Sequence, residues 1–391
     1  MNKKLSFQEK LLKMTKNQKK KTNKHVLIAL PIVIACTFLF TFIGKAQVPT
    51  VEKNPENVLT ASFVGDIMLG RNVEKVTDRY GKQHLFQYAK PFFDVSDYVT
   101  GNFEHPIATD HEQAAEKNIH LKTDKQSIEA LKDLNFSVLN FANNHAADYG
   151  EKGLNRTLDA FEDSGLDFTG AGRDLQDAKQ QISYKDVNGV KIATLGFTDV
   201  YGKGFKATNR QAGILPADPS IFIPMISQAA EKADLVVVHA HWGQEYDNEV
   251  NDRQRELAKA MSNAGADIII GAHPHVLEPM EMYNGTAIFY SLGNFIFDQG
   301  WSRTRDSALV QYHLTEEGKA TFEVVPMYIK EATPAPLKTG SLEQKSIIRQ
   351  LTNGTNIDWK EKDGHIFFEV DHSDKIKNLK EHGVKKTNEN H

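Results

Sequence analysis

The hydrophobic pattern separates an unbroken apolar run near the start of the chain from a long body in which short strand-like runs alternate with helical stretches. Val26–Gly44 carries no charge and only two threonines interrupt it. In the body, Gly150–Ser164 has apolar residues at helical spacing, and the apolar runs that precede and follow it are short and rich in β-branched residues. Strand–helix alternation of this kind predicts an α/β layered domain.

Changes in composition along the chain predict six segments. They are a cytoplasmic basic leader (1–25), a transmembrane anchor (26–44), a linker (45–57), a main α/β domain (58–315), a C-terminal β-rich extension (316–370) and a polar tail (371–391).

The apolar run, 26–44, is long enough to predict a membrane anchor. Its 19 residues, at about 1.5 Å each, nearly cross a hydrocarbon core of about 30 Å. Nine lysines precede it, so the positive-inside rule places the N-terminus in the cytoplasm and the main domain outside the cell. A cleaved signal peptide is the alternative, but its apolar core is usually about 7–15 residues and Gly44-Lys45-Ala46 is a poor cleavage site.

Charge and cysteine content narrow the function classes. Residues 1–45 hold ten lysines and one acid, so the remaining 346 residues, with 37 basic and 50 acidic side chains, carry a formal charge of −13. The only basic block is the leader, which argues against nucleic-acid binding and for contact with the membrane. Cys36, the only cysteine, lies in the apolar run, so the main domain has no disulfide and no thiolate nucleophile.

Five apolar runs end abruptly in side chains that bind metals. Asp, Glu, Asn and His supply oxygen and nitrogen donors for a divalent cation, and the carboxyl ends of strands are where α/β folds gather ligand-binding groups. Together the five strings predict a metal-dependent hydrolase-type site, and they end in Gly65-Asp66, Gly101-Asn102-Phe103-Glu104, Asn143-Asn144-His145, His239-Ala240-His241-Trp242-Gly243 and Gly271-Ala272-His273-Pro274-His275.

The first three strings supply mostly oxygen donors. Asp66 follows a strand and a glycine, where an aspartate that only closes an Asx turn is the competing interpretation. Asn102 and Glu104 are two residues apart and face one side if the pleat continues. Asn144 adds an amide oxygen, and the adjacent His145 is suited to protonate a leaving group near neutral pH. Asp148 lies three residues further on, where it either orients that imidazole or lies in a surface loop.

The last two strings supply imidazoles. His239 and His241 alternate along a strand end and therefore share a face. His273 and His275 flank Pro274, which favours an extended backbone with both rings accessible. His-x-His at a strand terminus is the most specific single motif of the chain.

Arginines beyond the site predict anion binding only weakly. Arg303 and Arg305 follow the Ser291-Leu292-Gly293-Asn294-Phe295 turn and could clamp a phosphate or carboxylate, although for each alone a solvated loop position is the simpler interpretation. No P-loop, Gly-x-Ser-x-Gly elbow or Rossmann fingerprint occurs.

In this order, the strings resemble the capsule biosynthesis protein CapA / poly-γ-glutamate synthesis protein PgsA family of Bacillus-type bacteria. The resemblance spans almost the whole chain and includes the lysine-rich leader, Gly65-Asp66-Ile67-Met68, His241-Trp242-Gly243 and His273-Pro274-His275. It implies a calcineurin-like metallophosphoesterase fold, a β-sandwich flanked by helices. It also implies a role in making or exporting poly-γ-glutamate, alongside an ATP-dependent amide ligase and a small membrane subunit.

The resemblance also implies roles for individual residues. Asp66 looks like the first-motif metal ligand, Asn144 like a ligand of a second metal and His145 like the acid, and the imidazole ligands would be His241, His273 and His275. Two positions depart from the superfamily pattern, since Met68 stands where a histidine is usual and Asn102 stands where a bridging aspartate is usual. Both departures fall on one metal position, so one or two ions (Mn, Fe or Zn) are expected.

Two function classes follow from these observations. In the first, a metal-dependent hydrolase acts on a phosphorylated intermediate or on the polymer itself. In the second, the domain is a non-catalytic extracellular accessory that guides or releases poly-γ-glutamate. A domain at −13 repels a polyanion through its net charge, so either function needs a discrete site to attract the polymer.

Overall fold

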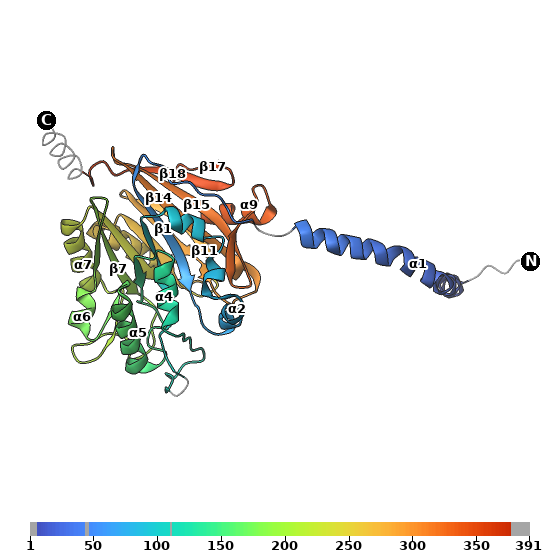
Figure 1. The fold of residues 1–391 in the computed structure, drawn as a ribbon, viewed down its shortest axis with the longest axis horizontal. Coiled ribbons are helices and arrows are strands. Elements are labelled where there is room, and N and C mark those ends of the chain that lie inside the picture. The colour runs from blue at the N-terminus through green and yellow to red at the C-terminus, as the bar shows by residue number, and fades with distance from the viewer. Residues whose placement is uncertain (1–5, 44–46, 110–111, 377–391) are drawn as a thin grey trace, which may run out of the picture. The chain divides into compact units, whose positions relative to one another are not determined.

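The computed structural model describes residues 6–43, 47–109 and 112–376, and the side chains of residues 36–43 are outside the described part. The chain forms two compact units, Met1–Gln47 and Val48–His391. Figure 1 shows the helices and strands of both units.

The first unit contains one long helix, α1 (Phe7–Ile43). The helix begins at a capping box, because the Ser6 N–H donates to Glu9 Oε2 at 2.7 Å and the Glu9 N–H donates to Ser6 Oγ at 3.3 Å. The predicted anchor, 26–44, overlaps the second half of α1, and its last part lies outside the described residues. Among the residues that the structure describes, no helix combines the length and the apolar character needed to cross a bilayer.

The second unit is built on a large mixed sheet and a smaller one. The large sheet has ten strands, of which eight run in the order β17-β18-β15-β14-β1-β2-β3-β4, while β13 pairs with β1 and β16 with β15. Its strands are β1 (Asn57–Ile67), β2 (Tyr98–Phe103), β3 (Val138–Asn140), β4 (Asp167–Thr169), β13 (Asn294–Ile296), β14 (Asp306–Thr315), β15 (Lys319–Lys330), β16 (Thr333–Pro336), β17 (Lys360–Lys362) and β18 (His365–Asp371).

The smaller sheet has the order β11-β12-β10-β9-β7-β6. Its strands are β6 (Ser183–Val187), β7 (Val190–Thr198), β9 (Leu235–His241), β10 (Ile268–Ala272), β11 (Leu277–Tyr283) and β12 (Thr286–Leu292), and a separate pair is formed by β5 (Ala171–Gly172) and β8 (Gly213–Ile214). The pairs β7–β9, β9–β10 and β10–β12 are parallel, as are β1–β2 and β2–β3 in the large sheet. Within each sheet, several strand carboxyl ends therefore share one edge.

The two sheets pack face to face around a common core. Alternate residues of each strand point inward, as shown by Phe63 of β1 and Tyr312 of β14 from the large sheet and by Val237 of β9 and Phe289 of β12 from the small one. All four side chains are buried. The predicted α/β sandwich is therefore confirmed.

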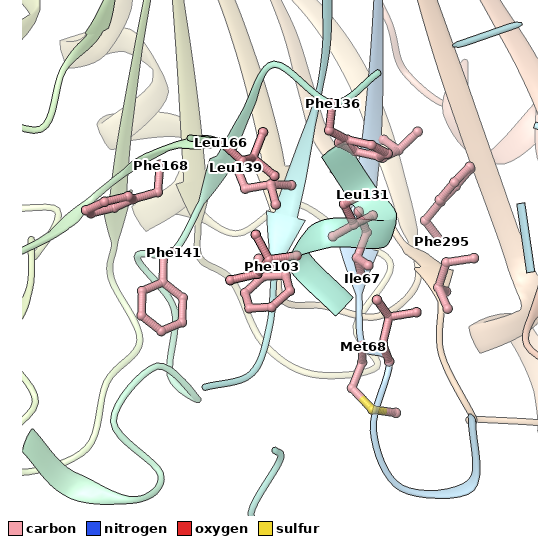
Figure 2. Close-up of a cluster of buried hydrophobic side chains, with 14 of the residues drawn as sticks. Ile67, Met68, Phe103, Leu131, Phe136, Leu139, Phe141, Leu166, Phe168 and Phe295 are labelled. Atoms are coloured by element: carbon pink, nitrogen blue, oxygen red, sulfur yellow. The ribbon is translucent and has the colours of Figure 1, made fainter. Parts of the chain in front are cut away.

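Helices cover the outer face of each sheet. One outer core joins the large sheet to its helices, and Figure 2 shows part of it, including Met68, Phe103, Leu131, Phe141 and Phe295. The helices on that side are α2 (Asn72–Tyr80), η1 (Lys82–Phe86), α3 (Lys90–Val95), α4 (Gln126–Asp133) and α5 (Gly150–Ser164). The small sheet packs on α6 (Leu175–Gln180), α7 (Pro219–Lys232) and α8 (Asp252–Ala264) through a third core.

Local sequence explains where α8 begins and where α8 and α5 end. The helix α8 begins at a capping box in which the Asn251 side chain accepts from the Gln254 N–H and Gln254 Oε1 accepts from the Asn251 N–H. It ends at Gly265, whose φ of 116° suits a residue without a Cβ. The helix α5 likewise ends at a left-handed glycine, Gly165.

The C-terminal part belongs to the large sheet and the common core. The predicted extension, 316–370, supplies β15, β16, β17 and β18 to the large sheet. It also contains α9 (Leu342–Leu351), and side chains of α9, β15 and β18 lie in the common core. The first residues of the predicted polar tail, 371–391, also pack on the second unit. Ile376 is buried in the core, and His372 Nδ1 lies 2.7 Å from the hydroxyl of Tyr312. These two contacts hold residues 372–376 against the second unit. The rest of the predicted tail lies outside the described residues.

Candidate metal centre

The carboxyl ends of β1, β2, β9 and β10 meet at one edge of the sandwich. Asp66 pairs with Asn102 of β2 on one side and with Asn294 of β13 on the other. Residue 65 is glycine because a Cβ there would lie 2.0 Å from the carbonyl oxygen of Gly293, where β13 approaches β1. This close approach places the Asp66 side chain at the junction of the two sheets.

Asp66 is held by donors from both sheets. Asn102 Nδ2 donates to Asp66 Oδ1 at 2.7 Å, and the backbone N–H of His273 donates to Asp66 Oδ2 at 3.3 Å. His275 Nδ1 lies 3.3 Å from the same Oδ2. The carboxylate thus links the large sheet to the His273-Pro274-His275 turn of the small one.

Glu104 is buried, and its carboxylate has no hydrogen bond to any described residue. Both Oε1 and Oε2 are inaccessible to solvent and lack a hydrogen-bond partner. The nearest imidazole nitrogens are His241 Nε2, 3.7 Å from Oε1, and His275 Nδ1, 3.9 Å from Oε2. Burial, followed by the neighbouring charge of Asp66, raises the pKa of Glu104 well above its ordinary value.

The imidazoles around Glu104 are buried, and for two of them this disfavours the protonated form. Burial lowers the pKa of His241, with His273 and His275 adding to the effect, and it lowers the pKa of His273 to about 3. His273 and His275 have positive φ values of 97° and 58°, which are uncommon for residues other than glycine. The turn that carries them is therefore strained, as turns at functional sites often are.

These side chains fit a divalent cation. Two groups of three have one ligand atom per residue within 4.8 Å of one another, and both contain Glu104, once with His241 and His273 and once with Asp66 and His275. Neutral imidazoles and carboxylates are the ligand types preferred by Zn, Mn and Fe. A cation between them would also offset the burial of Asp66 and Glu104, whose ion-pair partners among the described residues are weakly basic imidazoles.

Asn144 lies beside the first group. Its Oδ1 is 3.0 Å from His241 Nε2, while His241 Nδ1 accepts from Asn102 Nδ2 at 3.3 Å. With Nδ1 accepting, Nε2 of the neutral His241 carries the hydrogen and donates it to the amide oxygen of Asn144. Asn102 itself donates to Asp66, so its Nδ2 faces the cluster and its Oδ1 accepts from Asn140 Nδ2 at 2.8 Å.

His145 forms a hydrogen-bonded pair with Asp148. His145 Nδ1 lies 2.7 Å from Asp148 Oδ2, and the same oxygen accepts the N–H of Leu121 at 2.7 Å. Because a carboxylate accepts only, Nδ1 carries the hydrogen and Nε2 is left for a reacting group. Burial lowers the pKa of His145, and the hydrogen bond to Asp148 opposes this shift.

Lys117 completes this pair and was not predicted from the sequence. Its Nζ donates to Asp148 Oδ1 at 2.6 Å and to the carbonyl oxygen of Asn144 at 2.9 Å, and it lies 3.1 Å from His145 Nδ1. The lysine belongs to a long connection that is irregular around it, so no periodicity marks it. Asn294 was predicted only as part of a turn, and its Oδ1 lies 2.9 Å from His275 Nδ1.

Three predicted site residues lie apart from the cluster. His239 shares the inner face of β9 with His241 but lies deeper in the sandwich, where its Nε2 is 2.8 Å from Thr100 Oγ1. Arg303 is exposed on η2 (Ser302–Arg305), and Arg305 Nη1 donates to the hydroxyl of Tyr328 at 3.5 Å. Within the described residues, neither guanidinium is hydrogen-bonded or ion-paired to a residue of the cluster.

The residues that follow the first two strings have structural roles. Met68 is buried in the outer core, and its Sδ accepts the N–H of Gly70 at 3.2 Å. The Nε2 of His105 accepts the N–H of Leu69 at 2.7 Å, and burial lowers the pKa of His105 to about 3. Both side chains fix the loop after β1.

The family model described as "Bacterial capsule synthesis protein PGA_cap" matches residues 60–299. The chain is 63% identical over 378 residues to "PGA biosynthesis protein CapA" of Bacillus subtilis (strain 168), which covers 96% of this chain and 100% of the relative. It is 46% identical over 390 residues to "Capsule biosynthesis protein CapA" of Bacillus anthracis, which covers 97% of this chain and 94% of the relative.

Similar solved structures include a 5'-nucleotidase precursor from Thermus thermophilus, with a TM-score of 0.42 and 11% identity over 75% of this chain and 58% of that one. They also include the calcineurin-like phosphoesterase YfkN from Bacillus subtilis, with a TM-score of 0.37 and 14% identity over 71% and 88% of the two chains. TM-scores this low do not establish a shared fold, so neither match informs the function of this chain.

Proposed function

We propose that this chain, which belongs to the bacterial capsule synthesis protein PGA_cap family, acts in poly-γ-glutamate capsule biosynthesis through a metal-dependent hydrolase-type centre. The names of the two Bacillus relatives support the biosynthetic role. The hydrolase assignment is ours and depends on the geometry at the strand ends.

The buried carboxylate of Glu104 carries the proposal. A carboxylate with neither hydrogen bonds nor solvent is costly to retain unless a cation binds it. Asp66, Glu104, Asn144, His241, His273 and His275 would hold one or two ions of Zn, Mn or Fe. A bound ion of this kind supplies a Lewis acid for a phosphoryl or acyl oxygen.

His145 is the proposed proton donor. With Nδ1–H directed at Asp148, the second nitrogen, Nε2, is free to deliver a proton to a leaving group. Asp148 fixes the ring, and Lys117 balances the negative charge of Asp148. The lowered pKa of His145 makes its neutral form dominant at pH 7, so turnover that uses the protonated form increases as the pH falls toward that pKa.

We also propose the location and the partners that the sequence suggests. Residues 26–44 would anchor the chain in the cell membrane, with the leader in the cytoplasm and the second unit outside. The polymer, an ATP-dependent amide ligase and a small membrane subunit would be its partners. The lysine-rich leader supports this topology through the positive-inside rule.

One observation favours a second candidate function, a non-catalytic accessory that guides or releases the polymer. The cluster has an amide, Asn102, where the superfamily pattern implied a bridging carboxylate, and that amide donates to Asp66. The centre therefore has one anionic ligand fewer, which favours binding of a single ion over two. A single ion can organise a binding site without turning over a substrate.

The test compares metal content, turnover and polymer production for the full chain. We expect about one or two divalent ions per chain by elemental analysis and hydrolysis of a phosphoester or of poly-γ-glutamate, with His145→Ala losing rate while keeping the metal. Bound metal without turnover, together with normal polymer production by His145→Ala cells, would favour the accessory function. No metal in the wild type, together with normal production by the His273→Ala/His275→Ala variant, would exclude the metal centre.

A further inference from the structure

Two large aromatic side chains are exposed beside the metal centre. Tyr246 is 41% exposed and Trp301 is 52% exposed, and their ring centroids are 4.7 Å apart at an interplanar angle of 56°. Tyr246 follows β9 and Trp301 precedes η2, so the pair joins loops from the two sheets. Apolar side chains that gather on a surface mark interaction sites, whereas singly scattered ones do not.

Hydrogen bonds fix this aromatic pair to the metal centre. The N–H of Tyr246 donates to the carbonyl oxygen of Pro274 at 2.8 Å, and the Tyr246 hydroxyl accepts from Gln299 Nε2 at 3.1 Å. Gln299 Oε1 in turn accepts from Asn294 Nδ2 at 3.0 Å, and Asn294 Oδ1 is 2.9 Å from His275 Nδ1. A continuous chain of contacts thus leads from the exposed tyrosine to a proposed metal ligand.

Backbone strain extends from the centre to Tyr246. Tyr246 has a φ of 67°, a left-handed conformation that bulky residues rarely adopt, and His273 and His275 share this property. Its ring lies 6.1 Å from that of His275, centroid to centroid. Strained positions cluster at functional sites, which supports a role for the Tyr246 ring beside the centre.

We propose that Tyr246 and Trp301 form a subsite that binds a γ-linked glutamate chain next to the metal centre. The inference rests on the proposed function, which makes poly-γ-glutamate the ligand. In a γ-linked chain two methylene groups of every residue lie in the backbone between successive amides, whereas in the α-linked isomer they lie in the side chains. A γ-linked backbone therefore presents a regular apolar path that can lie on aromatic faces.

The charged residues around the aromatic pair are mixed in sign, so electrostatic attraction alone does not hold a polyanion there. Glu245 adjoins Tyr246, so the rim is not uniformly basic, and Asp298 is paired with Arg71 at 3.2 Å. The exposed Arg303 is two residues from Trp301 and can meet a carboxylate of the chain. Aromatic contact with the backbone and one guanidinium contact then hold a polyanion on a domain whose net charge repels it.

The test is calorimetric titration of the full chain with γ-linked decaglutamate and with α-linked decaglutamate, which has the same composition and charge. We expect the wild type to bind the γ-linked oligomer more tightly. The Tyr246→Ala/Trp301→Ala variant should lose roughly 30-fold in affinity for it, because aromatic anchors dominate such interfaces. Tyr184→Ala removes an equally exposed tyrosine from β6 and should bind as the wild type does.

Trp301→Leu, which keeps an apolar side chain but removes the aromatic face, should show an intermediate loss and guards against a folding defect in the double variant. Unchanged metal content in all variants would separate this subsite from the metal centre. Wild-type affinity in both the double variant and Trp301→Leu, or equal affinity for the two isomers, would overturn the subsite and leave the proposed function intact. A wild type that binds neither oligomer would overturn the subsite and also remove poly-γ-glutamate as the ligand.

Discussion

The two sheets contribute different chemistry to the same centre. The large sheet and its loops supply the oxygen-bearing side chains, Asp66, Glu104 and Asn144, whereas the small sheet supplies the imidazoles of His241, His273 and His275. Neither sheet alone has a set that would bind a borderline metal with both donor types. The centre therefore forms only when the two sheets are packed against each other.

This division couples folding to ligand binding. The core between the sheets holds the oxygen half against the nitrogen half, so a ligand that binds the assembled centre stabilises the packed state by mass action. Changes in the sandwich core and changes in the ligands should therefore affect the same two measurements, the free energy of unfolding and the affinity for metal.

The largest effect is expected from opening the common core. Phe63 is fully buried on the inner face of β1 and is not one of the proposed metal ligands. Phe63→Ala should lower the free energy of unfolding by about 3–5 kcal/mol in urea titrations. Added metal at about 100 times its Kd should restore about 2.7 kcal/mol. A variant whose stability does not respond to metal would argue against coupling; Tyr184→Ala serves as the surface control.

A comparison within one strand separates ligands from neighbours. His241→Ala should weaken metal binding by roughly 100-fold or more, because even residues that only support ligands contribute about 10–100-fold. His239→Ala, two residues earlier on the same face of β9, should change the affinity far less, since His239 bonds Thr100 instead. Competition with a chromophoric chelator measures both. Equal losses would place His239 among the ligands, as the sequence pattern suggested.

Two carboxylates, one in each sheet, should give opposite pH dependence of stability. Burial raises the pKa of Glu278 on β11 to about 9, with Gln254 as its partner. The folded state then keeps a proton that the unfolded state has lost between pH 4.5 and 9. The contribution of Glu278 to the free energy of unfolding is therefore fully present below its ordinary pKa of 4.5. It decreases by up to about 1.4 kcal/mol per pH unit as the pH rises toward the folded-state pKa of about 9. Glu278→Gln should flatten that decrease in urea titrations.

Glu323 on β15 provides the matched comparison in the large sheet. Burial alone would raise its pKa, but hydrogen bonds with His313 and His365 lower it to about 2. Its contribution is full above pH 4.5 and is lost as the pH falls toward 2. Glu323→Gln should therefore alter only the acid side of the profile. If both variants changed the same side, these two pKa shifts would not explain the pH dependence.

The smallest effect is expected from Lys117, which contacts Asp148 and His145 on the large-sheet side of the centre. Lys117→Met removes a cation that lowers the pKa of His145, so the pKa of His145 should rise and the pH optimum of turnover should move upward. We expect kcat to fall by roughly ten-fold, since a misplaced proton donor costs part of the roughly 10²–10⁴ that such catalysis supplies. Lys203→Met, at an exposed position, is the control. An unchanged pH profile would limit Lys117 to a structural role.

Much of this arrangement could be predicted from local sequence. Strand-like runs that end in Asp66, Glu104, His241 and His275 predicted that these side chains meet at one edge of the fold, because parallel strands bring their carboxyl ends together. The range of α5 followed from its apolar spacing.

Other features depend on contacts that no local pattern encodes. His239 and His241 look equivalent in the sequence, and only the depth of β9 in the sandwich separates them. Lys117 reaches Asp148 from an irregular connection, and the pairing of β1 with β14 joins residues far apart in the chain. Pairings and loop positions of this kind are decided by tertiary packing, which periodicity does not report.

The central position of β1 has a kinetic consequence. The strand β1 is synthesised early, but one of its two neighbours in the sheet order is β14 (Asp306–Thr315), which is synthesised late. The backbone N–H of His273 that donates to Asp66 likewise follows 207 residues later. At ribosomal rates of about 5–20 residues per second, that delay is roughly 10–40 s. During synthesis the unpaired edge of β1 is therefore exposed to chaperones and proteases long before the strand can be protected by its partner.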